Sequence, residues 1–206
     1  MRLVSFLTLS IWLMTAAFAA SPIKLVVFGD SLTAGFGINP AEAFPVKLEA
    51  ALRQRGLDVI VENAGVSGDT AKQGLERLEW SLAQDADAVI VELGANDALR
   101  GVDPNETRKS LNEIIAKLRA RATPVMIAGM LAPPNLGAAY KEHFDAIYPS
   151  LAREHGILLY PFFLEGIAGE PAFNLEDGIH PNPRGIDEIV KRMLPKVEEF
   201  LAMVQR

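Results

Sequence analysis

The stretch KLVVFGDSL at residues 24–32 is an apolar run that leads directly into a glycine, an acid and a serine. Three further polar motifs also follow hydrophobic runs: SGDT at residues 67–70, GAND at residues 94–97, and the pair Asp177 and His180. An open parallel α/β sheet collects functional groups outside the carboxyl ends of its strands, on loops that a rigid scaffold holds. The sequence therefore predicts that these four motifs meet at one edge of a parallel sheet.

The chain has 206 residues and half of its composition is hydrophobic. That length suffices for one well-buried core and is short for two ordinary domains. Residues 1–19 contain one basic residue, an apolar stretch and a small-residue end, which is typical of a signal peptide. An uncleaved anchor is the alternative, but the apolar stretch is shorter than the roughly 20 residues of a membrane span. We expect a signal peptide at residues 1–19 and a single domain at residues 20–206.

The composition excludes several classes of function. Cysteine is absent, which rules out disulfides, thiolate catalysis and zinc-cysteine sites. Removal of residues 1–19 takes away Arg2 and leaves 19 basic against 26 acidic residues, a formal net charge of −7. This acidity argues against a nucleic-acid partner, because a basic surface is what neutralises phosphates. We expect a periplasmic or secreted protein, monomeric and without a stable membrane anchor after cleavage.

Short apolar, β-branched runs alternate with longer amphipathic stretches, which is the pattern of repeated βα units. Five strands are predicted, at Lys24–Phe28, Asp58–Glu62, Ala88–Leu93, Pro124–Ala128 and Ile157–Tyr160. Five helices are predicted, at Ala41–Arg55, Thr70–Ala83, Pro104–Arg121, Ala138–His155 and Pro183–Met203. The expected fold class is α/β, a three-layer α/β/α sandwich around a flavodoxin-like five-stranded parallel sheet.

Ser31 is the candidate nucleophile. It ends the tight connection that leaves the first strand, where Gly29 permits the backbone turn. The simpler alternative is that Ser31 only caps the helical turn that follows. The α/β-hydrolase motif G-x-S-x-G is not matched, because Thr33 stands in place of its second glycine. Ser67, in another glycine-flanked loop, is the rival nucleophile.

A nucleophilic serine needs a base and an acid that orients the base. His143 and His155 fall within or at the end of a predicted helix, so we assign them surface or packing roles. His180 instead lies on the loop before the last helix, three residues after Asp177. Asp177 can accept a hydrogen bond from Nδ1 of His180 and leave Nε2 free to face Ser31. The alternative for Asp177 alone is a turn-forming role before a glycine.

Acyl transfer also needs hydrogen-bond donors aimed at the developing oxyanion. The backbone amide of Ser31 starts a helical turn, and the amide of Gly68 can approach a substrate closely because glycine has no side chain. The side chain of Asn96 can add a third N–H. Taken singly, Gly68 and Asn96 are also common loop and turn residues.

Together, these blocks resemble the GDSL, or SGNH, hydrolase family. The four matching blocks are FGDSLTAG at residues 28–35, NAGVSGDT at 63–70, VELGAND at 91–97 and DGIHP at 177–181. Within the family the chain is most similar to the bacterial periplasmic multifunctional esterase branch of thioesterases, lysophospholipases and arylesterases. It departs from that branch at Ala95, where glycine is common.

The resemblance implies the SGNH hydrolase fold and a set of residue roles. It implies Ser31 as the nucleophile, His180 as the base and Asp177 as the acid that orients it. It implies an oxyanion hole made by Ser31, Gly68 and Asn96. The expected reaction is hydrolysis of carboxylic esters and thioesters, including aryl esters, short to long acyl chains, acyl-CoA and lysophospholipid, through an acyl-enzyme on Ser31.

The loops at the carboxyl edge carry apolar side chains that predict an open groove for the acyl or aryl part of the substrate. The residues expected to bind substrate are Leu32, Leu99, Pro134, Leu136 and Ile179. Leu136 stands where the branch usually has an aromatic residue, which leaves the substrate preference open. The alternative is that several of these residues belong to the core.

Two other functions remain open from the sequence. A carbohydrate O-acetyl esterase on the same scaffold would need sugar-stacking aromatic residues, and the loss of Trp12 with the signal peptide leaves one tryptophan. A non-catalytic flavodoxin-like binding module would leave the pairing of Asp177 with His180 unexplained. The expected chemistry needs no metal and no organic cofactor.

Overall fold

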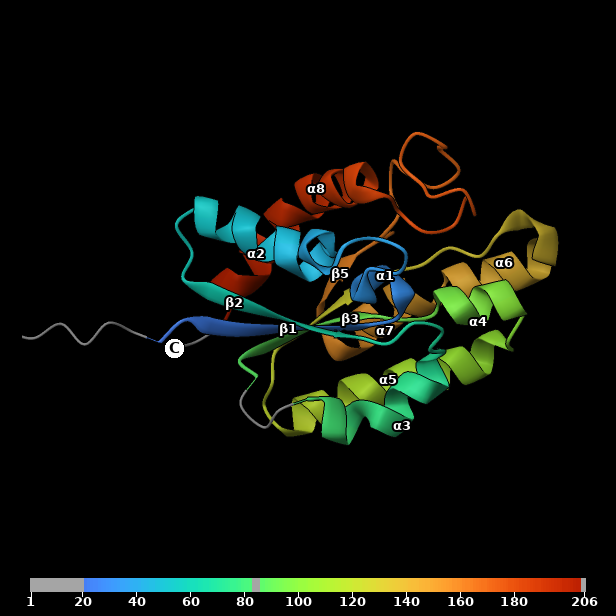
Figure 1. Ribbon diagram of the computed structural model, residues 1–206. Helices are drawn as coiled ribbons and strands as arrows, with labels where there is room; N and C mark the ends of the chain where they lie inside the picture. The colour runs from blue at the N-terminus through green and yellow to red at the C-terminus, as the bar shows by residue number, and fades with distance from the viewer. Residues whose placement is uncertain (1–20, 83–85, 205–206) are drawn as a thin grey trace, which may run out of the picture.

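A computed structural model describes residues 21–82 and 86–204, and its centre is a five-stranded sheet (Figure 1). All strand pairs are parallel, and the strand order is β2-β1-β3-β4-β5. The strands are β1 (Ile23–Gly29), β2 (Val59–Gly65), β3 (Ala88–Glu92), β4 (Val125–Ala128) and β5 (Leu158–Tyr160). This order is that of a flavodoxin-like doubly wound sheet. The predicted strands and fold class are confirmed.

Helices cover both faces of the sheet, which gives the predicted three layers (Figure 1). One face carries α2 (Phe44–Gln54) and α8 (Pro183–Ala202). The other face carries α3 (Ala71–Ser81), α5 (Pro104–Ala120) and α7 (Ile147–His155). The strands β1, β3 and β4 are buried at almost every residue, since helices take both faces of a parallel sheet out of water, whereas the edge strands β2 and β5 keep partly exposed residues.

The helix α5 begins and packs as its sequence predicts. The side chain of Asp103 accepts a hydrogen bond from the amide of Asn105 at 2.9 Å, and Pro104 occupies the first helical position. The apolar residues at helical spacing are all buried: Leu111, Ile114, Ile115 and Leu118.

The prediction of one helix over residues 138–155 is wrong, because the structure has two helices there. They are α6 (Ala138–Asp145) and α7, with Ala146 between them. Pro149 explains the break: it has no N–H to donate, and its ring clashes with the carbonyl of Asp145, four residues earlier. The second helix therefore starts afresh, with Pro149 in its first turn.

Three other short elements differ from the predicted set. The helix predicted from Ala41 begins at Phe44, after the 3₁₀ turn η1 (Pro40–Glu42). Two segments expected as loops are helical, namely α4 (Ala95–Arg100) and the 3₁₀ turn η2 (Pro134–Leu136). The helical turn expected at Ser31 is α1 (Ser31–Ala34).

The carboxyl ends of the three neighbouring strands β2, β1 and β3 lie in register. Gly29 at the end of β1 pairs with Gly65 of β2 and with Glu92 of β3. A Cβ atom at Gly29 would lie 2.2 Å from Oγ1 of Thr33 and 2.6 Å from the carbonyl oxygen of Glu92. Only glycine fits this close approach, which brings the first and third motifs to the same edge.

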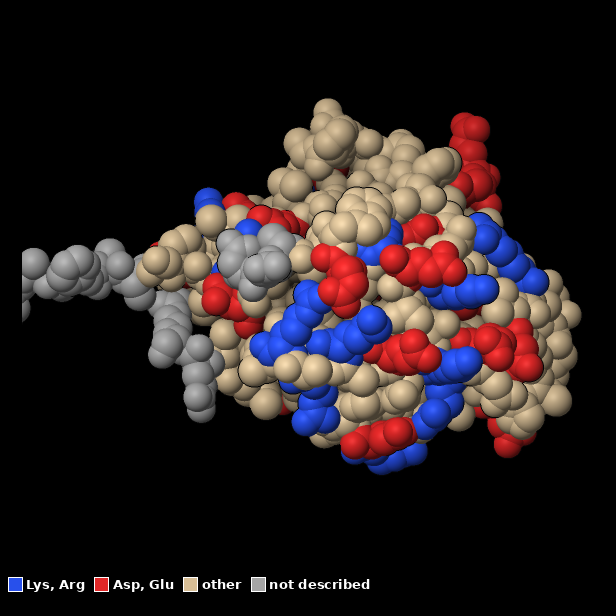
Figure 2. Space-filling model, turned by 90° about the horizontal axis from the view of Figure 1, so that it is seen from below, with Lys and Arg blue, Asp and Glu red and all other residues tan. Residues whose placement is uncertain are grey.

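Charged side chains of both signs are interleaved on the face that carries α3 and α5, as Figure 2 shows from below. Lys117 on α5 pairs with Glu79 on α3 at 3.5 Å, and Arg108 on α5 pairs with Glu154 on α7 at 2.5 Å. These exposed pairs link neighbouring helices and contribute little free energy each.

The signal peptide predicted at residues 1–19 lies outside the described residues. Within residues 21–82 and 86–204, no helix is both long and apolar enough to cross a bilayer.

A buried hydrogen bond between α7 and the end of β3 offers a test of the packing. The hydroxyl of Tyr148 donates to the carbonyl of Leu93 at 2.9 Å in the core. Tyr148→Phe leaves that carbonyl without this partner, so we expect the free energy of unfolding to fall by about 1–3 kcal/mol in urea denaturation. The control is Tyr160→Phe, which should lose less free energy of unfolding, because the Tyr160 hydroxyl makes only a long contact of 3.5 Å with Glu165. Equal losses in the two variants would contradict the assignment.

Candidate active site

Ser31, His180 and Asp177 form one hydrogen-bonded line, although 149 residues separate the serine from the histidine. Oγ of Ser31 lies 3.0 Å from Nε2 of His180, and Nδ1 of His180 lies 2.6 Å from Oδ2 of Asp177. Ser31 is the first residue of α1, with its side chain at the cleft. The rival Ser67 is exposed and makes no such contact among the described residues.

The loop that carries His180 is stabilised by hydrogen bonds between its own residues. Oδ1 of Asp177 accepts hydrogen bonds from the backbone amides of Ile179 at 2.9 Å and His180 at 3.0 Å. The amide of His180, the amide of Ile179 and the imidazole together lower the pKa of Asp177 to about 2. Asp177 is therefore an ionised acceptor at neutral pH. Asn182 ends the loop by capping α8 through the amides of Arg184 and Gly185.

The other two histidines stay away from this line, as predicted. His143 is exposed on α6, and His155 ends α7 with Nε2 2.7 Å from Oδ1 of Asn112. The sequence alone did not place an aromatic ring beside the imidazole. The ring of Phe36 packs against His180 with 4.5 Å between the ring centroids.

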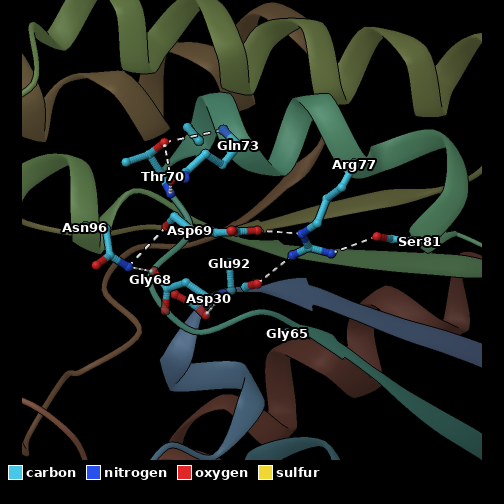
Figure 3. A network of polar contacts seen from close by, with 12 residues as sticks. Asp30, Gly65, Gly68, Asp69, Thr70, Gln73, Arg77, Ser81, Glu92 and Asn96 are labelled. Carbon is cyan, nitrogen blue, oxygen red and sulfur yellow. Dashed lines mark hydrogen bonds and ion pairs between the residues drawn. The ribbon is translucent and has the colours of Figure 1, made fainter.

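The loop of Gly68 and the helix α4 reach the same edge of the sheet. Gly68 has a φ of +88°, a left-handed conformation that favours glycine. Neither its amide nor that of Ser31 donates a hydrogen bond to another described residue. Asn96, in the first turn of α4, donates from Nδ2 to Oδ2 of Asp30 at 3.2 Å and to the carbonyl of Asp69 at 3.1 Å (Figure 3).

The role of Asn96 is therefore tied to its neighbours in a way that the sequence did not reveal. The sequence indicated only that Asn96 can add a side-chain N–H, and in the structure both hydrogens of Nδ2 have protein acceptors. The two acceptors are sequence neighbours of the other two proposed donors, since Asp30 precedes Ser31 and Asp69 follows Gly68. One amide group thus links the first three motifs.

Two buried carboxyl groups lie beneath the serine, and sequence reasoning assigned them no role. Oδ1 of Asp30 accepts from the amide of Leu32 at 3.0 Å and so caps α1. Oε2 of Glu92 accepts from Oγ1 of Thr33 at 2.8 Å and from the amide of Asp30 at 3.4 Å. Oε1 of Glu92 is buried without a hydrogen-bond partner among the described residues. The sequence did offer a signal for this site, because Glu92 is an acidic residue at the end of the otherwise apolar strand β3.

Burial is the largest influence on the pKa values of Asp30 and Glu92. Desolvation raises the pKa of Asp30 to about 6, although the amide of Leu32 and the side chain of Asn96 act in the opposite direction. Desolvation and the nearby charge of Asp30 raise the pKa of Glu92 well above its usual value. The core beneath Ser31 therefore shifts both carboxyl groups towards their neutral forms.

A cleft of about 620 Å³ opens beside Ser31 and His180, and its walls are mostly apolar. Four of the five residues predicted to bind substrate line it: Leu32, Leu99, Pro134 and Ile179. Sequence reasoning did not single out the side chains that complete the walls, among them Met130, Phe162 and Leu164.

The prediction for Leu136 is not met, because Leu136 does not line the cleft. Leu136 is the last residue of the 3₁₀ turn η2, and its Cδ2 would lie 3.8 Å from a Cβ atom at Gly101, where α4 ends. The sequence did not reveal this, because the segment was expected only as a loop.

The described residues contain no group of three His, Asp or Glu side chains placed to hold a metal ion. The chemical groups at the cleft are a hydroxyl, an imidazole, a carboxylate and amide donors. This set can form and hydrolyse an acyl-serine.

Comparison with known proteins identifies the family of this chain. The model of the GDSL-like lipase/acylhydrolase family matches residues 27–187. An arylesterase of Vibrio mimicus is 37% identical over 201 residues, which cover 97% of this chain and 96% of that protein. A thioesterase 1/protease 1/lysophospholipase L1 of Escherichia coli is 39% identical over 184 residues, 87% of each chain.

A solved structure extends the similarity to three dimensions. The crystal structure of AlinE4, an SGNH-hydrolase family esterase, is 43% identical in sequence and has a TM-score of 0.75. The match covers 88% of this chain and 97% of AlinE4. This chain therefore belongs to the GDSL-like lipase/acylhydrolase family and is an ester-cleaving hydrolase.

Proposed function

We propose that this protein is a serine esterase that hydrolyses carboxylic esters and thioesters through an acyl-enzyme on Ser31. One observation carries the proposal, namely the line in which Nε2 of His180 lies 3.0 Å from Oγ of Ser31 while Nδ1 faces Asp177 at 2.6 Å. These distances are within hydrogen-bond reach for a nucleophile, its base and the acid that orients the base.

In the proposed first step, His180 removes the proton of Ser31 as Oγ attacks the ester carbonyl. Asp177, ionised because of its low pKa, holds Nδ1–H and stabilises the imidazolium that forms. His180 then gives the proton to the leaving alcohol or thiol. In the second step the same imidazole activates a water molecule, which releases the acid and regenerates Ser31.

The proposed oxyanion hole consists of the amides of Ser31 and Gly68 and the side chain of Asn96. The two backbone amides have no other acceptor among the described residues, which leaves them available for the oxyanion. Asn96 shares one of its Nδ2 hydrogens, now held by Asp30 at 3.2 Å, with the charge that develops in the transition state.

The proposed substrates are aryl esters and thioesters or lipid esters with linear acyl chains, including acyl-CoA and lysophospholipid. The apolar cleft supports this, because each buried methylene contributes about 0.8 kcal/mol. The names of the relatives, an arylesterase and a thioesterase 1/protease 1/lysophospholipase L1, point to the same classes. We further propose that residues 1–19 are a cleaved signal peptide and that the remaining single domain acts in the periplasm or outside the cell as a monomer.

The buried pair beneath Ser31 makes the stability of the proposed enzyme depend on pH. Asp30 has a pKa of about 6 in the folded chain, above its value of 3.8 in a model peptide. Between these two values the folded state holds a proton that the unfolded state has lost. Stability from Asp30 is thus fully present below about pH 4 and is lost as the pH rises through about 6.

Ser31→Ala tests the proposed function directly. We expect the turnover of p-nitrophenyl esters from acetate to laurate, of acyl-CoA and of lysophospholipid to fall at least about a thousandfold, because the nucleophile is absent. The control variant is Ser67→Ala, which should keep parental turnover. Equal turnover by Ser31→Ala and the parent would refute the proposal. An acetylated sugar is assayed alongside, and parental activity confined to that sugar would refute the proposed substrates.

Asn96→Ala tests the oxyanion hole. We expect kcat for a p-nitrophenyl ester to fall by about 10²- to 10³-fold with little change in KM, since the donor acts on transition-state charge. Steady-state kinetics beside the exposed control Asn105→Ala measure this effect. A loss of less than about threefold would count against the donor role.

Asp30→Asn tests the protonation of the buried pair. The variant cannot ionise at this position, so it escapes the destabilisation that the parent suffers between pH 4 and pH 7. We expect the difference in the free energy of unfolding, variant minus parent, to increase by about 2 kcal/mol as the pH rises from 4 to 7. Urea denaturation at several pH values measures the difference. A difference that stays constant with pH would contradict the raised pKa of Asp30.

A further inference from the structure

An arginine is buried behind the loops of the active site. Arg77, on α3, is only 6% exposed, and within the described part of the chain no other Lys or Arg is buried. Its Nε lies 2.5 Å from Oδ2 of Asp69, and its Nη2 donates to the carbonyl of Gly29 at 2.8 Å. Its Nη1 donates to Ser81 at 3.0 Å (Figure 3). The guanidinium also lies 4.2 Å from the ring centre of Phe28.

Two of these partners lie beside the backbone donors of the proposed oxyanion hole. Asp69 directly follows Gly68, and Gly29 comes two residues before Ser31. The guanidinium therefore bridges the loop after β2 and the last residue of β1, from which the turn to Ser31 starts. Its planar, rigid arrangement of donors suits this task, whereas a lysine has a single ammonium on a flexible stem.

The bridge is independent of the one that Asn96 forms on the other side of the same loop. Asn96 holds the carbonyl of Asp69, whereas Arg77 holds its carboxylate. Asp69, the neighbour of Gly68, is thus held at both its backbone and its side chain.

We propose that Arg77 is a positioning residue that keeps the amides of Ser31 and Gly68 aimed at one common point, where the oxyanion forms. The inference rests on the proposed function. Arg77 touches neither the reacting atoms nor the cleft, and it acts only through Asp69 and Gly29. Because aligned donors stabilise the transition state more than the bound ester, loss of Arg77 acts on kcat and leaves KM almost unchanged.

A purely structural role would give a different result. Removal of Arg77 alone leaves a buried carboxylate without its partner, which destabilises the fold. Each molecule that still folds would then turn over ester at the parental rate. The rate per folded active site therefore separates the two roles.

The experiment uses Arg77→Lys and the neutral pair Arg77→Gln with Asp69→Asn, which avoids an unpaired buried carboxylate. An alkyl fluorophosphonate counts the functional active sites, and kcat and KM are measured with p-nitrophenyl butyrate. An alkyl trifluoromethyl ketone, which places an oxyanion in the hole after addition of Ser31, reports the alignment of the donors. The exposed Arg192→Gln, which breaks a pair with Glu188, is the matched control.

We expect kcat per titrated site to fall by about 10- to 100-fold in both Arg77 variants, with KM within about twofold of the parent. The inhibition constant of the ketone should rise by the same factor as kcat falls, and Arg192→Gln should match the parent. A kcat per site within threefold of the parent, or ketone binding that is unchanged, would overturn the inference. If Ser31→Ala is inactive while the Arg77 variants match the parent, only this inference fails, whereas an active Ser31→Ala refutes the proposed function itself.

Discussion

The close approach of β1 and β3 at Gly29 is the constraint on which the site depends. With no side chain at this position, the carboxyl of Glu92 reaches the amide of Asp30 and the hydroxyl of Thr33. The chain can then turn within two residues, and Asp30 caps the helix that Ser31 begins. Any side chain at Gly29 would collide with Glu92 and push the two strands apart. The position of the nucleophile is thus set by sheet packing, before any contact with His180.

The region beneath the cleft holds polar groups that a core usually excludes. Asp30 and Glu92 are buried without a cationic partner in the described residues, and desolvation raises both pKa values. Asp69 is buried as well, but Arg77 neutralises it at 2.5 Å. Burying such groups costs free energy that an apolar core would not lose, and such arrangements gather at functional sites. The buried carboxyl groups and Arg77 hold the short loops of the site by hydrogen bonds.

Much of this molecule could be predicted from its sequence, because the deciding signals are local. The alternation of apolar runs with amphipathic stretches revealed the strands, and the Asp103-Pro104 pair marked the start of α5. The break at Ala146 was also readable, since Pro149 cannot continue a helix, but the prediction of one helix over residues 138–155 made no use of that signal. Leu136 was misplaced for another reason. Whether a loop side chain lines a cleft depends on the neighbouring α4, which no pattern near Leu136 encodes.

The sequence by itself determined the βα order, the glycine that permits the turn at Ser31, and the short Asp177–His180 loop. These features arise from backbone conformation and from residues a few positions apart, so local physics suffices for them. Only the tertiary structure decided the 3.0 Å contact between Ser31 and His180, the occupied hydrogens of Asn96 and the bridge made by Arg77. Each of these joins segments far apart in the chain, and their distances follow from how the whole sheet and its helices pack.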